Sequence, residues 1–211
     1  MDDHEFAELR QHMIAEIAAK TIFACGQLDK VPRHEFVPFE LQPFAYADTP
    51  LPIGFDKTIS QPFIVAVMTD LLDLQATDVV LEVGTGLGYQ SAVLAELAQQ
   101  VYSIELIESL GTQAAERLAA MGYRNVEVRI GDGYAGWPEK APFDGIVVTA
   151  AAPNIPPALV AQLKPGGRMV IPVGGEGAIQ FLKVLTKRAD GGTDEREVIP
   201  VRFVPLVPGK K

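Results

Sequence analysis

Three glycines spaced one residue apart, Gly84, Gly86 and Gly88, directly follow a run of apolar residues. A glycine-rich turn between a buried strand and a helix lets a ligand approach the backbone where a Cβ atom would clash. Dinucleotide folds use the spacing G-x-G-x-x-G, which brings a pyrophosphate to a helix N-terminus. Here the spacing is G-x-G-x-G, and Glu82 stands two residues before it. A carboxylate there repels phosphate but suits a cationic amino group, which disfavours a nicotinamide dinucleotide.

Two further acidic residues lie at the end of the second predicted strand and just after the third. Glu105 can accept hydrogen bonds from two ribose hydroxyls. Asp132, between Gly131 and Gly133, can accept one from an exocyclic amine such as that of adenine. Each has a simpler interpretation, because Glu105 could be a solvated strand end and Asp132 could only stabilise a turn. Together with the glycines they predict a ligand with an amino-acid end, a ribose and an adenine, as in S-adenosylmethionine.

Alternating strands and helices must position these residues. The alternation predicts an α/β fold with a doubly wound, mostly parallel seven-stranded sheet, helices on both faces and an antiparallel C-terminal strand. Apolar runs predict strands at 79–83, 101–105, 126–130, 145–149, 169–173, 181–186 and 198–207, the last two joined by a polar turn at 190–194. Helices are expected at 89–99, 107–121 and 156–163.

The first 78 residues precede this alternation. Apolar residues at helical spacing predict an amphipathic helix from Phe6 to Ile17. Five prolines with four aromatic residues between them predict irregular structure pinned by aromatic burial over residues 31–58, on the substrate side. A helix at 61–72 follows, with Ser60 as its N-cap and Pro62 in its first turn. We expect one domain, with this N-terminal part, a cofactor-binding core at 79–174 and a hairpin at 175–211.

The composition excludes several classes of protein. The chain has 211 residues, a formal net charge of −9 and no basic cluster, so nucleic acid is not an expected partner. No apolar stretch is long enough to cross a bilayer and no signal peptide is visible. Cys25 is the only cysteine, which fits a reducing cytoplasm, and His4, His12 and His34 lack metal-ligand spacing. We expect a cytoplasmic monomer without a metal or membrane partner.

The segments described so far belong to a longer pattern. The chain resembles bacterial protein-L-isoaspartate O-methyltransferases, which are class I, Rossmann-like S-adenosylmethionine-dependent enzymes. The glycine motif and Pro-Gly-Gly near residue 166 are common to many methyltransferases, whereas two segments are particular to this family. These are Thr58-Ile-Ser-Gln-Pro62 and Phe203-Val-Pro-Leu206. The matching segments occur in the same order as in the family and extend over nearly the whole chain. They include Val31-Pro-Arg-His-Glu-Phe-Val-Pro38, Leu51-Pro-Ile-Gly54 and Phe143-Asp-Gly-Ile-Val-Val-Thr-Ala-Ala-Ala152.

The resemblance implies methylation of the free carboxylate of isoaspartyl residues in damaged proteins, with S-adenosyl-L-homocysteine as product. The ester then closes to a succinimide, and its hydrolysis restores some normal aspartate. By the same resemblance Ser60 is the catalytic residue, Thr58 and Ser60 bind substrate, and Phe203 and Val204 hold the peptide backbone. Phe63 stands where many eukaryotic and archaeal relatives carry a histidine. The implied cofactor-binding residues are Glu82, Gly84, Thr85, Gly86, Gly88, Glu105, Leu106, Asp132 and Gly133.

Other functions fit parts of the sequence. A methyltransferase of a small-molecule carboxylate would share the cofactor half, because one fold hosts many functions. It would have no reason to keep the two family-specific segments. An inactive cofactor-binding interaction protein is disfavoured by the intact set of Glu82, Glu105, Asp132 and Ser60. A nicotinamide oxidoreductase is disfavoured by the glycine spacing.

Overall fold

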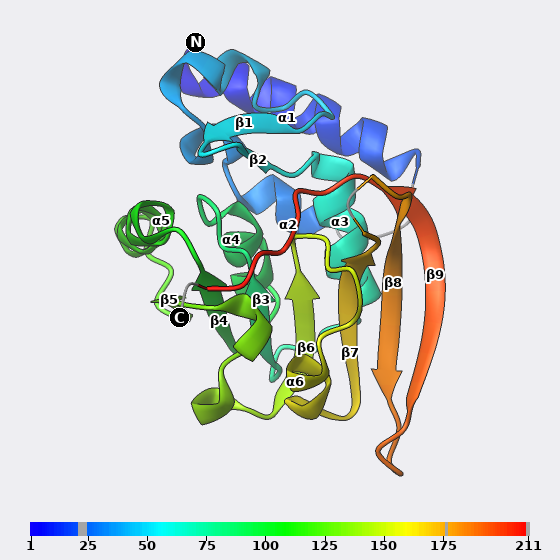
Figure 1. Cartoon of the computed structure of the whole chain (residues 1–211). Helices are drawn as coiled ribbons and strands as arrows, with labels where there is room; N and C mark the ends of the chain where they lie inside the picture. Colours follow the sequence, from blue (N-terminus) through cyan, green and yellow to red (C-terminus); the bar gives the residue numbers. More distant parts are fainter. Residues whose placement is uncertain (21–24, 176, 210–211) are drawn as a thin grey trace.

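A seven-stranded sheet forms the centre of the computed structural model, which describes residues 1–20, 25–175 and 177–209 (Figure 1). The strand order is β5-β4-β3-β6-β7-β8-β9. Neighbouring strands from β5 to β7 are parallel, whereas β8 is antiparallel to both β7 and β9. This confirms the predicted fold class. The strands are β3 (Val79–Val83), β4 (Gln100–Glu105), β5 (Val126–Ile130), β6 (Phe143–Val148), β7 (Leu163–Val173), β8 (Gln180–Lys187) and β9 (Thr193–Val201).

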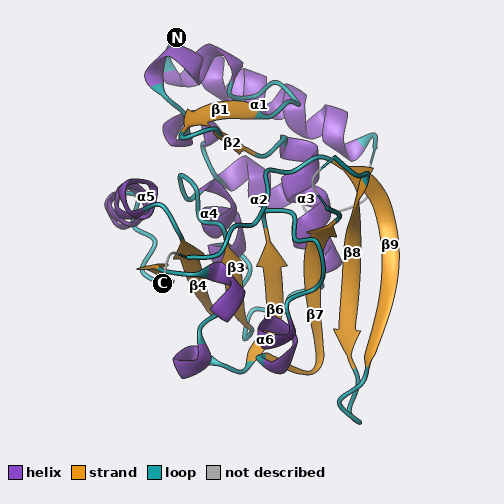
Figure 2. Cartoon of the chain, viewed as in Figure 1, coloured by secondary structure: helices purple, strands orange, loops and turns teal. Residues whose placement is uncertain are grey.

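Helices cover both faces of the sheet (Figure 2). Successive strand residues point to opposite faces. Accordingly, Val80 and Val147 pack with residues of α3 and α4, while Leu81 and Ile146 pack with residues of α6 and the η3–η4 region on the other side. The helices are α1 (Asp3–Ala18), α2 (Cys25–Lys30), α3 (Pro62–Leu71), α4 (Tyr89–Ala95), α5 (Glu108–Ala120) and α6 (Pro157–Ala161), with 3₁₀ helices η1 (Arg33–Phe36), η2 (Phe39–Phe44), η3 (Gly133–Ala135) and η4 (Pro138–Lys140).

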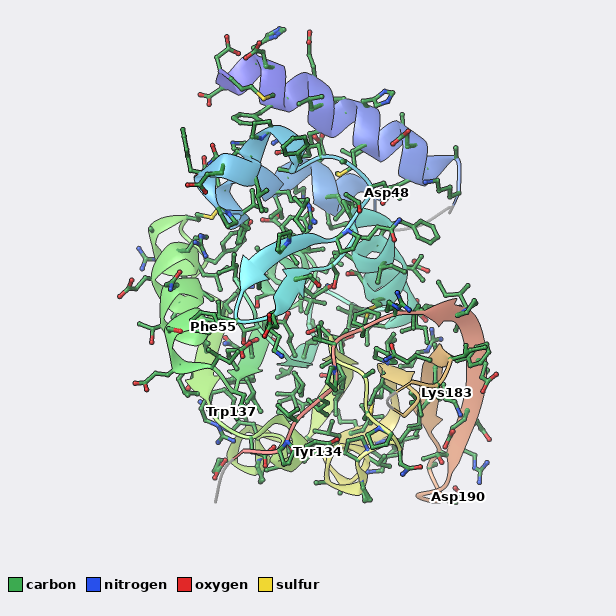
Figure 3. All side chains as sticks on the ribbon, turned by 45° about the horizontal axis from the view of Figure 1, so that its top comes forward. Asp48, Phe55, Tyr134, Trp137, Lys183 and Asp190 are labelled. Atoms are coloured by element: carbon green, nitrogen blue, oxygen red, sulfur yellow. The ribbon has the colours of Figure 1, made fainter. Side chains whose placement is uncertain are left out.

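The proline-rich segment is more regular than predicted. It contains η1, η2 and an antiparallel hairpin of β1 (Leu51–Gly54) and β2 (Lys57–Ile59). The hairpin turns at Gly54, Phe55 and Asp56, which all have positive φ angles, and Figure 3 marks its tip at Phe55. The hairpin is not predictable from the sequence pattern, because two of its turn residues are not glycine and residues with side chains rarely adopt such φ angles.

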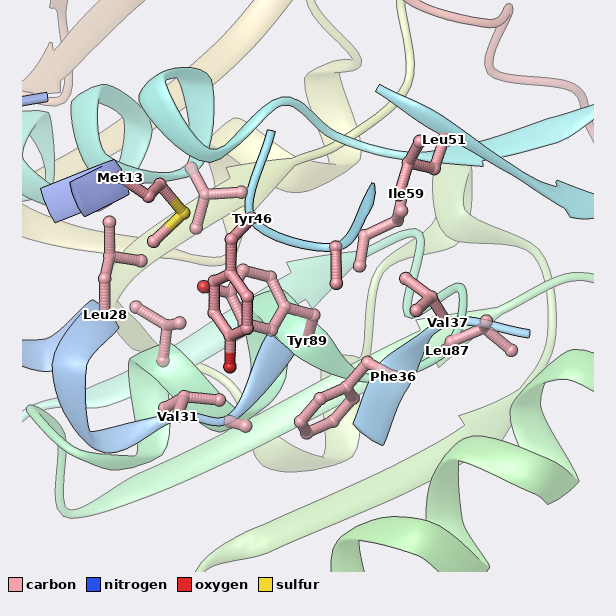
Figure 4. Close-up of a cluster of buried hydrophobic side chains, with 14 of the residues drawn as sticks. Met13, Leu28, Val31, Phe36, Val37, Tyr46, Leu51, Ile59, Leu87 and Tyr89 are labelled. Atoms are coloured by element: carbon pink, nitrogen blue, oxygen red, sulfur yellow. The ribbon is translucent and has the colours of Figure 1, made fainter. Parts of the chain in front are cut away.

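Only some of the aromatic residues pin this segment. Phe36 and Tyr46 are buried, and Phe36 packs edge-on against Tyr89 with ring centroids 5.5 Å apart (Figure 4). Phe39 and Phe44, in contrast, are 80% and 57% exposed. The expectation that aromatic burial holds the whole segment is therefore wrong for η2.

The predicted helix cap at Ser60 is also wrong. Helix α3 begins at Pro62, which lacks a backbone donor and is well suited to a first turn. Gln61 is the residue before the helix, and its side chain makes no capping hydrogen bond. The Ser60 side chain therefore caps no helix and is available for another role.

The C-terminal strand is displaced from its predicted position. Strand β9 ends at Val201, so residues 202–207 are not part of it. They cross the carboxyl ends of the strands towards β4 as the red segment of Figure 1, which we call the C-terminal segment. Pro205 forms a single parallel bridge to Ala151 and has no N–H to extend a ladder. Two predicted helices also end early. Helix α4 stops at Ala95. Helix α6 stops at Ala161, because Leu163 already begins β7.

Candidate active site

A cavity of about 190 Å³ borders the glycine turn. We call it the glycine-loop cavity. It lies where the strand order reverses between β3 and β6, the usual place for a ligand in an open α/β sheet. Gly84 and Gly86 line it, whereas Gly88 does not. Its walls are otherwise mostly apolar, with Ile53 and Phe55 from the hairpin, Ile104, Leu106, Ile107 and Leu110 from the β4–α5 region, and Val204, Leu206 and Val207 from the C-terminal segment.

Thr149 fixes the start of the glycine turn. Its hydroxyl lies 2.7 Å from the carbonyl oxygen of Gly84 and 3.1 Å from that of Val83, to which it can donate. A Cβ atom on Gly84 would collide with this hydroxyl, and Gly84 also has a φ of +98°. Thr149 was not among the predicted site residues, because a single threonine at a strand end forms no recognisable pattern. Its position after Val148, at the end of a central strand, is the only signal it offers.

Glu105 connects β4 to the glycine turn and lines the cavity. Its Oε2 atom accepts from the backbone N–H of Gly86 at 2.8 Å, and its Oε1 atom accepts from that of Ile107 at 3.0 Å. Each carboxylate oxygen has two lone-pair sites, so both can accept a further hydrogen bond. Glu105 can therefore hold the turn and still receive two hydroxyl groups of a ligand.

Glu82 does not face the cavity, contrary to the expectation that it meets a cationic amino group. It is fully buried, on the face of the sheet that α4 covers, and lines none of the cavities described here. Ser91 and Ser103 both donate to its Oε2 atom, the latter at 2.7 Å. Ser103 in turn lies 2.6 Å from the hydroxyl of Thr85. Glu82 thus supports the glycine turn indirectly, through hydrogen bonds that link its carboxyl group to Ser103 and Ser103 to Thr85 in the turn.

Burial raises the pKa of Glu82 to about 8, so its carboxyl group is protonated at neutral pH. In the unfolded chain the same group ionises near pH 4.5. Unfolding between these values releases a proton, so Glu82 makes the free energy of unfolding fall as the pH rises, by up to about 1.4 kcal/mol per pH unit.

We therefore expect Glu82→Gln to remove this pH dependence. The glutamine side chain is neutral throughout, and its carbonyl oxygen can still accept from Ser91 and Ser103. Urea unfolding of both proteins at pH 5, 6, 7 and 8 measures the effect, with wild type losing stability relative to the variant as the pH rises. Two stability curves that stay parallel over this range would contradict a protonated Glu82.

Asp132 and Gly133 follow β5, where η3 begins. Gly133 lines the cavity, as expected. Asp132 does not, and its Oδ1 atom accepts from the backbone N–H of Tyr134 at 2.9 Å, so its turn-stabilising interpretation describes what it does in this structure. The Tyr134 hydroxyl donates to the carbonyl oxygen of Leu206 at 3.2 Å and lies beside the C-terminal segment (Figure 3). Asp132 thus lies where β5 meets this segment.

Ser60 and Thr58 line two further cavities beside the first. The larger, of about 440 Å³, lies between the start of α3 and the C-terminal segment, and we call it the tail cavity. The smaller, of about 40 Å³, lies between Ser60 and the glycine turn. Thr58 and Thr149 line all three cavities. A ligand in the glycine-loop cavity and one in the tail cavity would therefore meet near Thr58, Ser60 and Thr149. Phe63 lines none of the three.

The C-terminal segment forms the outer wall of the tail cavity. Phe203 exchanges hydrogen bonds with the side-chain amide of Gln180, at 2.6 and 3.1 Å, and Val204 accepts from the N–H of Ala151 at 2.8 Å. The N–H groups of Arg202 and Val204 have no partner among the described residues. An extended peptide could pair with such free groups by strand addition.

No group of histidine, cysteine or acidic side chains among the described residues could hold a metal ion. Within the same residues, no helix combines the length and the apolar character that a membrane span requires.

A family model and two curated relatives that match this chain share one description. The family model for "Protein-L-isoaspartate(D-aspartate) O-methyltransferase (PCMT)" matches residues 5–211. Protein-L-isoaspartate O-methyltransferase 1 of Polaromonas sp. (strain JS666) is 60% identical over 216 residues, covering 96% of this chain and 91% of the relative. The protein of the same name from Nitrosospira multiformis is 55% identical over 208 residues, covering 96% and 88%.

Two solved structures share the fold. A protein-L-isoaspartate O-methyltransferase matches with a TM-score of 0.83 and 27% identity, over 93% of this chain and 65% of that longer chain. A Plasmodium falciparum protein solved in complex with S-adenosyl-L-homocysteine matches with a TM-score of 0.79 and 22% identity, over 94% of this chain and 98% of that chain.

Proposed function

The chain belongs to the protein-L-isoaspartate(D-aspartate) O-methyltransferase family, and from this premise we propose how its cavities divide the reaction between them. The enzyme transfers a methyl group from S-adenosylmethionine to the free carboxylate of an isoaspartyl residue and so starts its repair through a succinimide. The glycine-loop cavity would hold the cofactor and the tail cavity the damaged peptide. The observation that carries this assignment is that Thr58 and Thr149 line both.

The residues of the glycine-loop cavity suit S-adenosylmethionine. Glu105 has free lone pairs for two ribose hydroxyls, and Gly86 brings the backbone close without a side chain. Leu106, Ile107 and Leu110 offer an apolar wall to a flat base. When bound, the cofactor supplies an activated methyl group on a sulfonium. In this proposal Glu82 is a positioning residue that acts through Ser103 and Thr85, and Asp132 shapes the end of the cavity through Gly133 and Tyr134.

The carboxylate that receives the methyl group needs no general base. Its pKa lies near 4 in an ordinary peptide, so it is already ionised at neutral pH. The protein has to bring it into line with the methyl group, and good positioning of reacting atoms can supply roughly 7–11 kcal/mol of the barrier. Ser60 is suited to this task, because its hydroxyl makes no hydrogen bond with the described residues and lies at two of the cavities.

Ser60 would donate to one carboxylate oxygen and leave the other aimed at the methyl group. A strong bond would stabilise the nucleophile before reaction, so the contribution of Ser60 is orientation more than charge stabilisation. The free N–H group of Val204 would hold the peptide backbone beside it, and Phe203, whose own backbone groups both bond to Gln180, would form part of the wall of the tail cavity. Backbone pairing suits an enzyme that reads an abnormal backbone in many sequence contexts.

Paired peptides test this function directly. We expect methyl transfer from labelled S-adenosylmethionine to a peptide that contains one isoaspartyl residue, and none to the same peptide with a normal aspartyl residue. The two differ only in which carboxylate is free. Equal labelling of both would contradict recognition of the isoaspartyl backbone, and labelling of a small carboxylic acid alone would favour the small-molecule alternative.

We also propose that the enzyme works as a monomer in the cytoplasm, without a nucleic acid or membrane partner. Its net charge of −9 is unfavourable for polyanions, and its single cysteine fits a reducing compartment. Its partners would then be the damaged proteins themselves.

A further inference from the structure

The described residues that line the proposed peptide-binding cavities carry little charge. Next to the tail cavity, a groove of about 880 Å³ continues along the C-terminal segment to the start of β8, and we call it the tail groove. Among the described residues that line the tail cavity and the tail groove, Arg202 alone is charged. It lines both, so a peptide that occupies the tail cavity and the tail groove would lie close to it.

Arg202 is free to meet such a peptide. Its side chain is exposed, while its neighbours Val201 and Phe203 pack against the apolar core. It makes no ion pair or side-chain hydrogen bond with any residue that the structure describes. Arg129 and Arg188, in contrast, pair with carboxylates at 3.3 and 3.2 Å.

The net charge of the chain makes this one cation important. A protein with a formal charge of −9 repels acidic peptides. Screening limits that repulsion to about 8 Å at physiological ionic strength, so charges along the path of the peptide matter most. An arginine side chain can bind a carboxylate through two parallel hydrogen bonds. Arg202 can therefore offset the repulsion locally where it lines the tail cavity and groove.

We propose that Arg202 determines substrate preference, by selecting isoaspartyl segments that carry an acidic side chain next to the damaged residue. The proposal rests on the function proposed above and adds a preference within that substrate class. Arg202 acts in binding, and the methyl-transfer step belongs to the groups around Ser60.

Three isoaspartyl peptides that differ at one neighbouring position, with Glu, Gln or Lys there, test the preference. We expect wild type to show the lowest KM for the Glu peptide. In Arg202→Gln the KM for the Glu peptide should rise roughly two- to fivefold, as for an exposed ion pair, with kcat unchanged. The KM for the Lys peptide should stay the same or fall. Arg202→Lys keeps the charge and should retain most of the preference, and high salt should reduce it in wild type.

Arg196→Gln is the matched control. Arg196 is exposed on β9, carries the same charge and lines neither the tail cavity nor the tail groove. Equal changes in Arg202→Gln and Arg196→Gln, or no change in the Glu-to-Lys preference, would overturn the inference. A fall in kcat for all three peptides at constant KM would also overturn it. If wild type methylates none of the isoaspartyl peptides, the proposed function fails and this inference with it.

Discussion

Replacing Glu105 with alanine is expected to weaken S-adenosylmethionine binding by roughly a hundredfold or more. The substitution removes a charged acceptor for two ribose hydroxyls, and hydrogen bonds to charged groups contribute about 1.5–3 kcal/mol each. It also leaves the N–H groups of Gly86 and Ile107 without their acceptor, so the glycine turn loses a support before any ligand binds. Calorimetric titration with the cofactor and with S-adenosyl-L-homocysteine measures the loss.

Glu105→Gln should be nearly as damaging, although its side chain has the same size. A glutamine has one acceptor oxygen, so its NH₂ group would have to face one of the two backbone N–H groups. Glu108→Ala is the control, because Glu108 is exposed in the first turn of α5 and lines none of the cavities. An unchanged dissociation constant in Glu105→Ala, with the protein folded, would remove Glu105 from the cofactor site.

Replacing Ser60 with aspartate is expected to abolish most turnover while leaving cofactor binding and stability nearly intact. Its negative charge would face the incoming carboxylate and repel it. Ser60→Ala should lower kcat about a hundredfold, the loss expected when a reacting group is misplaced by about 1 Å. Because the Ser60 side chain caps no helix, neither change should cost the roughly 0.5–2 kcal/mol typical of a lost N-cap.

Ser109→Asp provides the control for an added charge, since Ser109 is exposed on α5 and lines no cavity described here. Methyl transfer to an isoaspartyl peptide, cofactor titration and thermal unfolding should be measured on all three variants. A folded Ser60→Asp protein that binds the cofactor and methylates the peptide at the wild-type rate would refute the catalytic role of Ser60.

The sheet was the most predictable part of the molecule. Strands β3 and β5 have the predicted bounds, because a polar residue precedes each of them and a glycine follows. The placement of Gly84, Gly86 and Glu105 at one cavity also follows from strand order, since carboxyl ends of parallel strands meet at one edge. These features depend on local patterns that a single sequence displays.

Side-chain direction was harder to predict, but Glu82 carried a usable signal. In β3 the two-residue period places Glu82 on the same face as Val80, which is the face that α4 covers. That period indicates a buried carboxyl group, whereas the glycine motif alone suggested a ligand. Its partners Ser91 and Ser103 come from α4 and β4, so tertiary packing was needed to find them.

Other features depend on contacts that no local pattern encodes. Thr149 acts through its hydroxyl on Gly84, 65 residues earlier in the chain. The C-terminal segment leaves β9 because Gln180 takes both backbone groups of Phe203, and a glutamine in a strand gives no sign of this. The hairpin before Ser60 turns through residues with unfavourable backbone angles, which the rest of the fold must stabilise.

The course of the C-terminal segment has a consequence for how the cofactor and the peptide affect each other's binding. Val204 lines both the glycine-loop cavity and the tail cavity. The backbone of Leu206 donates a hydrogen bond to the carbonyl oxygen of Ala151 and accepts one from the hydroxyl of Tyr134. A ligand in either cavity would restrict the same short stretch of backbone, so the second ligand would lose less entropy on binding than the first. The two affinities must then rise by the same factor, because this coupling is reciprocal. Cofactor and damaged peptide would thus favour each other's retention until methyl transfer is complete.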